Sequence, residues 1–153
     1  MTLLRLTPLC LAALLGPHLA ARAATGAELF AATCQACHQA SGEGAPGIAP
    51  PLTGTLAKRA ALPEGRAWLV QVLVSGLTGP ITSRGEPYNG VMPPAAALSD
   101  AEVAAVLGHV LTQFNGVGGA LPQAADVTSA RSRSVKAAEL RQQRKRLLAQ
   151  TGE

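Results

Sequence analysis

Two cysteines and a histidine stand together in the segment Cys34-Gln35-Ala36-Cys37-His38, which has the spacing C-x-x-C-H. Two thiols one helical turn apart can each add to a vinyl group of the same porphyrin. The adjacent imidazole can then bond the iron from the proximal side. The spacing therefore predicts covalent attachment of one c-type haem through Cys34 and Cys37, with His38 as an axial ligand of the iron.

A C-x-x-C sequence also occurs in thioredoxin-like redox pairs and as one half of a zinc site. A thioredoxin-like site requires a βαβ pattern around the motif, and a structural zinc requires a second pair of ligands. No cysteine follows Cys37 in this chain. Both alternatives fit the sequence poorly, and haem attachment is favoured.

A second axial ligand is predicted at Met92, the only methionine after the initiator. It lies in a loop rich in glycine and proline that runs from Leu77 to Pro94, where a core residue would be out of place. A thioether is a known ligand of haem iron, and Pro93 and Pro94 stiffen the backbone that follows. His109 is the alternative ligand, but it lies off the apolar face of its helix and is expected to be a flank residue.

Three segments carry the start and stop signals of helices. Residues 25–28 and 99–102 have the spacing of capping boxes, and Pro63 suits the first turn of a helix that ends at Gly76. The helix after Ser99 has one broad apolar face and ends at Asn115-Gly116. No segment alternates convincingly as a strand. The sequence therefore predicts an all-α fold of about three main helices around the haem, without a significant β-sheet.

The loop after His38 is expected to support that histidine. Residues 41–51 are dominated by glycine and proline, and the segment 47–52, which includes Pro50 and Pro51, cannot form regular structure. A metal-bound histidine usually donates its other ring N–H to a carbonyl or carboxylate group. We expect a carbonyl oxygen of this loop to accept that hydrogen bond.

Residues 1–23 have the features of a secretory signal peptide. They contain Arg5, an apolar run from Leu6 to Leu15 and an A-x-A cleavage site at residues 21–23. The run is shorter than the roughly 20 residues of a spanning helix, so cleavage is favoured over retention as an anchor. Cleavage would remove Cys10 and leave only the two cysteines of the haem motif, which excludes a disulfide framework. The expected location is the periplasm.

The net charge of +4 is unevenly distributed. Residues 24–120 carry four basic and six acidic side chains, whereas residues 121–153 carry seven basic and three acidic ones. We therefore divide the mature chain into a haem-binding domain, residues 24–118, and a basic tail, residues 119–153. In the tail, residues 120–134 are expected to be extended and residues 135–150 to favour helix. A solvated, partly ordered tail is favoured, with docking on an acidic partner or an anionic membrane surface as the alternative. No nucleic-acid partner is expected.

From about residue 25 to residue 116 the chain resembles the class I monohaem cytochromes c, of the exported bacterial type with His/Met ligation. The resemblance rests on Gly26 with Phe30, the C-x-x-C-H motif, Pro50-Pro51-Leu52, Asn89-Gly90-Val91-Met92-Pro93-Pro94 and the helix from Ser99. More narrowly, residues 77–81 and 87–89 resemble monohaem cytochromes that accompany periplasmic dehydrogenases and reductases. The resemblance implies a small fold in which the first and last helices cross near Gly26. The family more often has an aromatic residue where this chain has His109.

Several further side chains are expected to support the haem pocket: Pro50, Pro51, Trp68, Tyr88 and Asn89. Trp68 is most simply a core residue, and a haem propionate is one candidate partner for its indole N–H.

The function that these features favour is one-electron transfer without catalysis. Two protein ligands would fill both axial positions of the iron and leave no open position for a substrate. The expected partners are redox proteins: a dehydrogenase, a reductase, an oxidase or a respiratory complex. Two alternatives stay open, namely a fixed haem subunit of a larger oxidoreductase and a haem enzyme or gas-binding protein with a displaceable Met92.

Overall fold

The computed structural model describes residues 22–152 of the chain. The predicted signal peptide therefore lies almost wholly outside the described residues, as does Cys10. The helices are α1 (Gly26–Thr33), α2 (Gln35–His38), α3 (Ala57–Ala61), α4 (Pro63–Ser75), α5 (Asp100–Asn115), α6 (Ala124–Arg131) and α7 (Ala137–Thr151). The strands are β1 (Leu77–Thr78), β2 (Ile81–Ser83), β3 (Glu86–Tyr88) and β4 (Val91–Met92). The prediction of an all-α fold is confirmed, because the strands form only two short antiparallel pairs, β1 with β4 and β2 with β3.

The ends of α1 and α5 are fixed by the capping boxes that the sequence predicts. At α1, the Glu28 carboxylate accepts a hydrogen bond of 2.7 Å from the backbone N–H of Thr25, whose hydroxyl accepts one from the Glu28 N–H. Ser99 and Glu102 form the same reciprocal pair at the start of α5. Each box satisfies backbone donors that a helix start would otherwise leave unpaired.

Helices α1 and α5 cross at Gly26. A methyl group at this position would place its carbon 2.2 Å from the carbonyl oxygen of Ala105, so only glycine allows this approach of the two backbones. Next to the crossing, the ring of His109 packs against the rings of Phe30 and Phe114, with ring centroids 5.8 Å and 5.1 Å away, and the two phenylalanine rings also contact each other at 5.1 Å. The crossing that the resemblance implied is therefore present, and His109 takes part in the ring contacts beside it.

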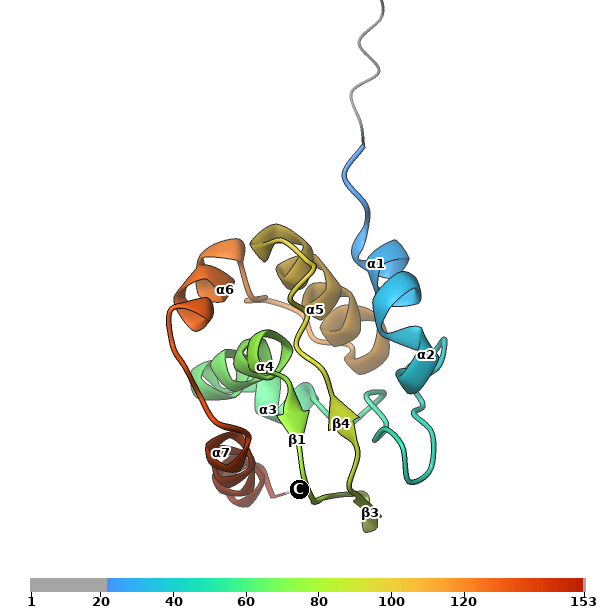
Figure 1. Ribbon diagram of the computed structural model, residues 1–153, viewed down its shortest axis with the longest axis vertical. Helices are drawn as coiled ribbons and strands as arrows, with labels where there is room; N and C mark the ends of the chain where they lie inside the picture. The colour runs from blue at the N-terminus through green and yellow to red at the C-terminus, as the bar shows by residue number, and fades with distance from the viewer. Residues whose placement is uncertain (1–21, 153) are drawn as a thin grey trace, which may run out of the picture.

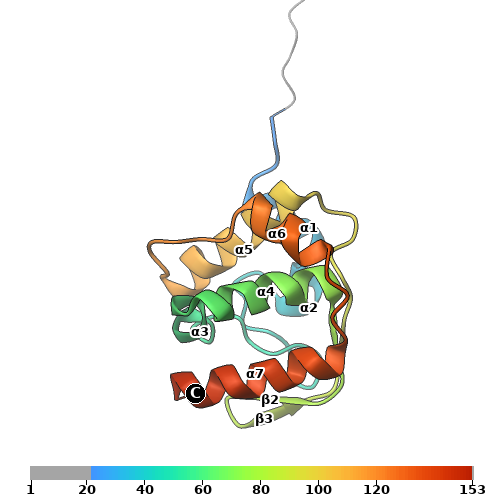
Figure 2. The same ribbon diagram turned by 90° about the vertical axis from the view of Figure 1, so that its left-hand side faces the viewer.

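The C-terminal residues form two helices that pack on the body, and α4 lies between them (Figure 2). Val127 and Ala130 of α6 and Leu140 of α7 are fully buried. The expectation of an extended segment at 120–134 is therefore wrong, and the tail is folded rather than solvated. The reason is that a few small apolar side chains find a complementary surface on α4 and α5, which composition alone does not reveal. We call residues 119–152 the C-terminal extension.

Residues 76–99 connect α4 to α5 and contain the four strands (Figure 1). We call this connecting segment the excursion. It leaves α4 at Gly76, runs out along β1 and β2, and returns along β3 and β4. The register of β1 and β4 pairs Leu77 with Met92 and Thr78 with Val91. Within residues 22–152, no helix has both the length and the apolar character needed to cross a membrane.

Candidate haem-binding site

The junction between α1 and α2 brings the two thiols to one helical turn. Cys34 ends α1 and precedes α2, and its carbonyl oxygen accepts hydrogen bonds from the N–H groups of Cys37 at 3.2 Å and His38 at 3.0 Å. Both cysteines are free thiols; Cys34 is half-buried and Cys37 is exposed. Burial raises the pKa of the Cys34 thiol, although a hydrogen bond with Thr33 opposes that rise.

The imidazole of His38 is buried, with 7% of the residue exposed. Its Nδ1 lies 3.2 Å from the carbonyl oxygen of Pro50. Because a carbonyl oxygen can only accept, Nδ1 carries the proton, and Nε2 keeps a lone pair for a metal. Burial also lowers the pKa of His38, which favours the neutral form that ligates metals. The expectation that the proline loop provides this carbonyl is confirmed.

The proline loop reaches His38 because it folds back on itself. The N–H of Gly44 donates to the carbonyl oxygen of His38 at 3.0 Å, and the N–H of Leu52 donates to that of Gly42 at 2.7 Å. Gly44 has φ of +76°, and a methyl group there would lie 2.5 Å from the carbonyl oxygen of Ala49. Glycine is therefore required both for the left-handed turn and for the close approach.

Met92 is partly buried and packs against the hydrophobic core, as does Cys34. Its backbone is held on the side of α4, where a methyl group on Gly76 would lie 2.6 Å from the carbonyl oxygen of Met92. Just beyond the two prolines, the N–H of Ala95 donates to the carbonyl oxygen of Leu73 in α4 at 2.8 Å. The methionine is thus fixed to the last turn of α4.

The loop that carries Met92 meets the loop that supports His38. A methyl group on Gly90 would lie 2.5 Å from the carbonyl oxygen of Ile48, so the two backbones touch at this point. In Figure 1, α2 and the loop after it lie on the same side of the molecule as β4. The fold thus brings the loop that carries Met92 into direct contact with the loop that supports His38, although the two are far apart in sequence.

The other residues predicted to support the haem pocket differ in how deeply they are buried. Pro51 is half-buried, Tyr88 is buried on β3, and Asn89 is exposed. Trp68 is a core residue of α4, as expected, but its indole Nε1 donates to the carbonyl oxygen of Leu140 at 2.9 Å. The one indole hydrogen is therefore donated to α7. The suggestion from the sequence that it bonds a haem propionate is wrong.

Sequence reasoning missed the glycines that let the two loops touch. Gly44, Gly76 and Gly90 each stand where another backbone passes too closely for a side chain. The available signal was the high glycine content of both loops, but composition does not say which glycine meets which segment.

The residues present fit a covalently bound haem. Two free thiols stand one turn apart, a buried imidazole has its Nδ1 hydrogen-bonded and its Nε2 available, and a thioether lies on the loop that touches the proline loop. A thioether sulfur and an imidazole nitrogen are donor atoms that haem iron takes as axial ligands.

The chain belongs to the cytochrome c family, because the family model for cytochrome c matches residues 23–114, which is more than half of its length. Among curated relatives, it is similar to a cytochrome c-552 of Thermus thermophilus, with 47% identity over 96 residues. That match covers 63% of this chain and 64% of the relative, so the chain spans less than two thirds of the relative's length. A second cytochrome c-552 of the same species is 47% identical over 91 residues, which cover 60% of this chain and 69% of the relative. Membership implies a covalently bound haem c, and the family match ends at residue 114, before α6 and α7.

Proposed function

We propose that this protein is an exported one-electron carrier in which Cys34 and Cys37 bind the haem covalently and His38 and Met92 are the axial ligands. The observation that carries this proposal is the hydrogen bond between Nδ1 of His38 and the carbonyl oxygen of Pro50. It orients the ring and selects the tautomer with a free Nε2, as is usual for a metal-bound histidine. When bound, the haem supplies one-electron chemistry, because its iron passes between the ferrous and ferric states.

The residues of this chain favour a carrier over an enzyme. Met92 is held against α4 by the Gly76 contact and by the Ala95 hydrogen bond, and two prolines stiffen the chain between them. A ligand fixed in this way keeps the sixth position filled, so that the protein passes electrons without binding a substrate.

Redox partner proteins would meet the molecule where the two loops touch. Ile48 and Val91 lie at this contact and are 62% and 75% exposed, which is unusual for large apolar side chains. They are thus an exposed apolar pair on the two loops that carry Met92 and support His38. We propose that a periplasmic dehydrogenase, reductase or oxidase docks there, as expected for a shuttle that forms transient complexes.

The ligand assignment is tested by spectroscopy on protein exported to the periplasm. Ferric wild-type protein should have the weak long-wavelength sulfur-to-iron absorption band, and Met92→Ala should lose the band and lower the reduction potential. The matched control is His109→Ala, which should keep the band. Cys34→Ala combined with Cys37→Ala should lose the haem that survives acid extraction. A wild-type haem that acid extracts freely, or a band that survives in Met92→Ala, would contradict the assignment.

A further inference from the structure

The C-terminal extension contacts both arms of the excursion that carries Met92. One arm is β1, which leads away from α4, and the other is the segment from Met92 to the start of α5. Each arm receives an arginine side chain from the extension, and these two arginines come from different helices.

Arg141 of α7 binds the outgoing arm. Its Nη1 donates a hydrogen bond to the carbonyl oxygen of Thr78 in β1. The guanidinium lies against the backbone of Gly79, where a methyl group would come within 2.7 Å of Nη1. Because β1 pairs with β4, Arg141 bonds to the strand that lies directly beside Met92.

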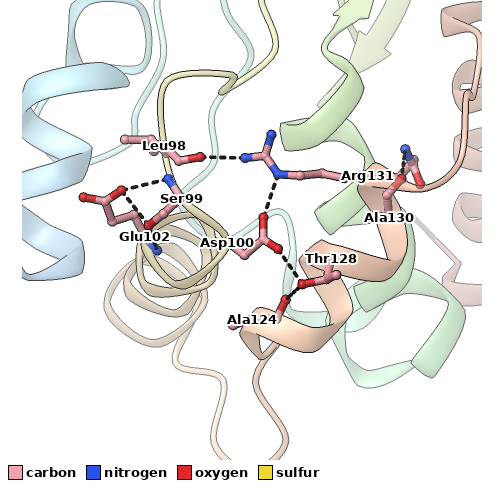
Figure 3. Close-up of polar contacts among 9 residues, drawn as sticks. Leu98, Ser99, Asp100, Glu102, Ala124, Thr128, Ala130 and Arg131 are labelled. Carbon is pink, nitrogen blue, oxygen red and sulfur yellow. Dashed lines mark hydrogen bonds and ion pairs between the residues drawn. The ribbon is translucent and has the colours of Figure 1, made fainter.

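Arg131 of α6 binds the returning arm (Figure 3). Its Nη2 donates to the carbonyl oxygen of Leu98 at 2.6 Å, and its Nε donates to Oδ1 of Asp100 at 2.7 Å. The other oxygen of Asp100 accepts a hydrogen bond of 2.5 Å from the hydroxyl of Thr128, also on α6. The side chain of Arg131 is 32% exposed, so solvent competes only in part with these bonds.

We propose that Arg131 and Arg141 are positioning residues that keep Met92 at the haem iron and thereby set how readily an added ligand replaces it. This inference rests on the proposed ligation by Met92. The thioether leaves the iron more easily when the excursion moves away from the body, and the two arginines hydrogen-bond main-chain carbonyls on both of its arms. Loss of either bond raises the population of the open state in which the sixth position is accessible.

The chain provides a matched control for each arginine. Arg146 lies on α7, and Arg133 follows the last turn of α6. Both are exposed, and neither side chain makes a hydrogen bond or ion pair within residues 22–152. Arg146→Ala and Arg133→Ala therefore remove the same charge from the same regions without removing a bond to the excursion.

The experiment measures binding of cyanide and imidazole to the full-length ferric holoprotein. We expect Arg131→Ala and Arg141→Ala each to increase the apparent affinity for cyanide about tenfold, the equivalent of about 1.4 kcal/mol. The sulfur-to-iron band should also bleach at lower imidazole concentration, while both control variants behave as wild type. Guanidinium unfolding is followed in parallel. A purely structural role would change the unfolding midpoint and leave cyanide binding under native conditions unchanged.

Wild-type cyanide affinity in both arginine variants would overturn the inference, as would equal increases in the control variants. Should an alanine variant fail to yield holoprotein, Arg131→Lys and Arg141→Lys are read by the same criteria, since lysine keeps the charge but loses the paired donors. If Met92 is not a ligand of the iron at all, the same experiment shows this in a different way. In that case the wild type itself lacks the sulfur-to-iron band, and Met92→Ala binds cyanide as the wild type does.

Discussion

The indole Nε1 of Trp68 donates a hydrogen bond of 2.9 Å to the carbonyl oxygen of Leu140, and this bond joins α4 to α7. The guanidinium carbon of Arg59 lies over the indole ring, 5.8 Å from its centroid, within the range of a cation–π contact. The side chain of Leu140 is itself fully buried. The C-terminal extension is consequently part of the folded core, although it lies beyond the segment that matches the family.

Leu140→Ala should destabilise the holoprotein by about 2 to 5 kcal/mol, because it removes a fully buried leucine and leaves a cavity between α4 and α7. Guanidinium unfolding followed by circular dichroism measures this change. Leu148→Ala, at a half-buried position of the same helix, is the matched control and should cost less. Equal effects of the two substitutions would mean that α7 does not dock through Leu140.

Trp68→Phe should destabilise the protein by about 1 to 3 kcal/mol, because a buried carbonyl oxygen loses its donor while most of the ring volume is kept. Since the indole hydrogen is used by Leu140, the visible spectrum of the haem and its reduction potential should not change. A clear shift of the potential in Trp68→Phe would instead indicate a bond between the indole and a haem propionate.

Gly26→Ala should prevent the native crossing of α1 and α5, because its methyl carbon would lie 2.2 Å from the carbonyl oxygen of Ala105. We expect a loss of stability of several kcal/mol, of the order seen for overpacked cores or greater. Gly108→Ala is the control. It makes the same change within α5, where the nearest neighbour would be 4.0 Å away, and should be neutral or stabilising by up to about 1 kcal/mol through helix propensity. Similar yields and melting temperatures for the two variants would contradict the close crossing.

Acid should weaken the start of α5 through Glu102. Hydrogen bonds from the side chain and then the backbone of Ser99 hold the pKa of this carboxyl below its ordinary value of 4.5. The folded state therefore binds the proton less readily than the unfolded state. The contribution of Glu102 is fully present at neutral pH and is lost as pH falls below 4.5 through the lowered pKa.

The measurement compares unfolding midpoints at pH 7 and pH 4. Glu102→Gln can still form a capping box but cannot ionise, so its midpoint should fall less between these two values than that of the wild type. Glu86→Gln is the control, since the side chain of Glu86 is exposed and makes no hydrogen bond or ion pair with any residue that the structure describes. An identical fall in Glu102→Gln and wild type would contradict the role of the capping box.

Features fixed by local chemistry could be predicted from the sequence. Pro63 and Gly76 delimit α4, and the box at residues 99–102 starts α5, because caps and turns act over a few neighbouring residues. The C-x-x-C-H spacing and the proline loop after it are also local. They led directly to the bond between His38 and Pro50.

Features that depend on distant partners could not be predicted in the same way. The N-cap of helix α6 is Gln123, which is a weak capping signal, and the buried residues Val127 and Ala130 of this helix are small. Its stability comes from contacts with α4 and α5 and from the Arg131 bond to Asp100, none of which leaves a periodic pattern in the sequence. The contact between Gly90 and Ile48 and the partner of Trp68 are of the same kind.

The docking of α7 also has a consequence for the lifetime of the native state. Trp68 and Leu140 are 72 positions apart, and Thr78 and Arg141 are 63 apart, so these bonds close long loops of chain. Such contacts are costly to form early, and we expect them to follow the rate-limiting step of folding. Substitutions where α7 contacts α4 or β1 should then alter the unfolding rate and leave the folding rate nearly constant. Stopped-flow kinetics of Leu140→Ala would show this as a shift of the unfolding limb alone. The extension would thereby govern how long a folded molecule persists rather than how quickly one forms.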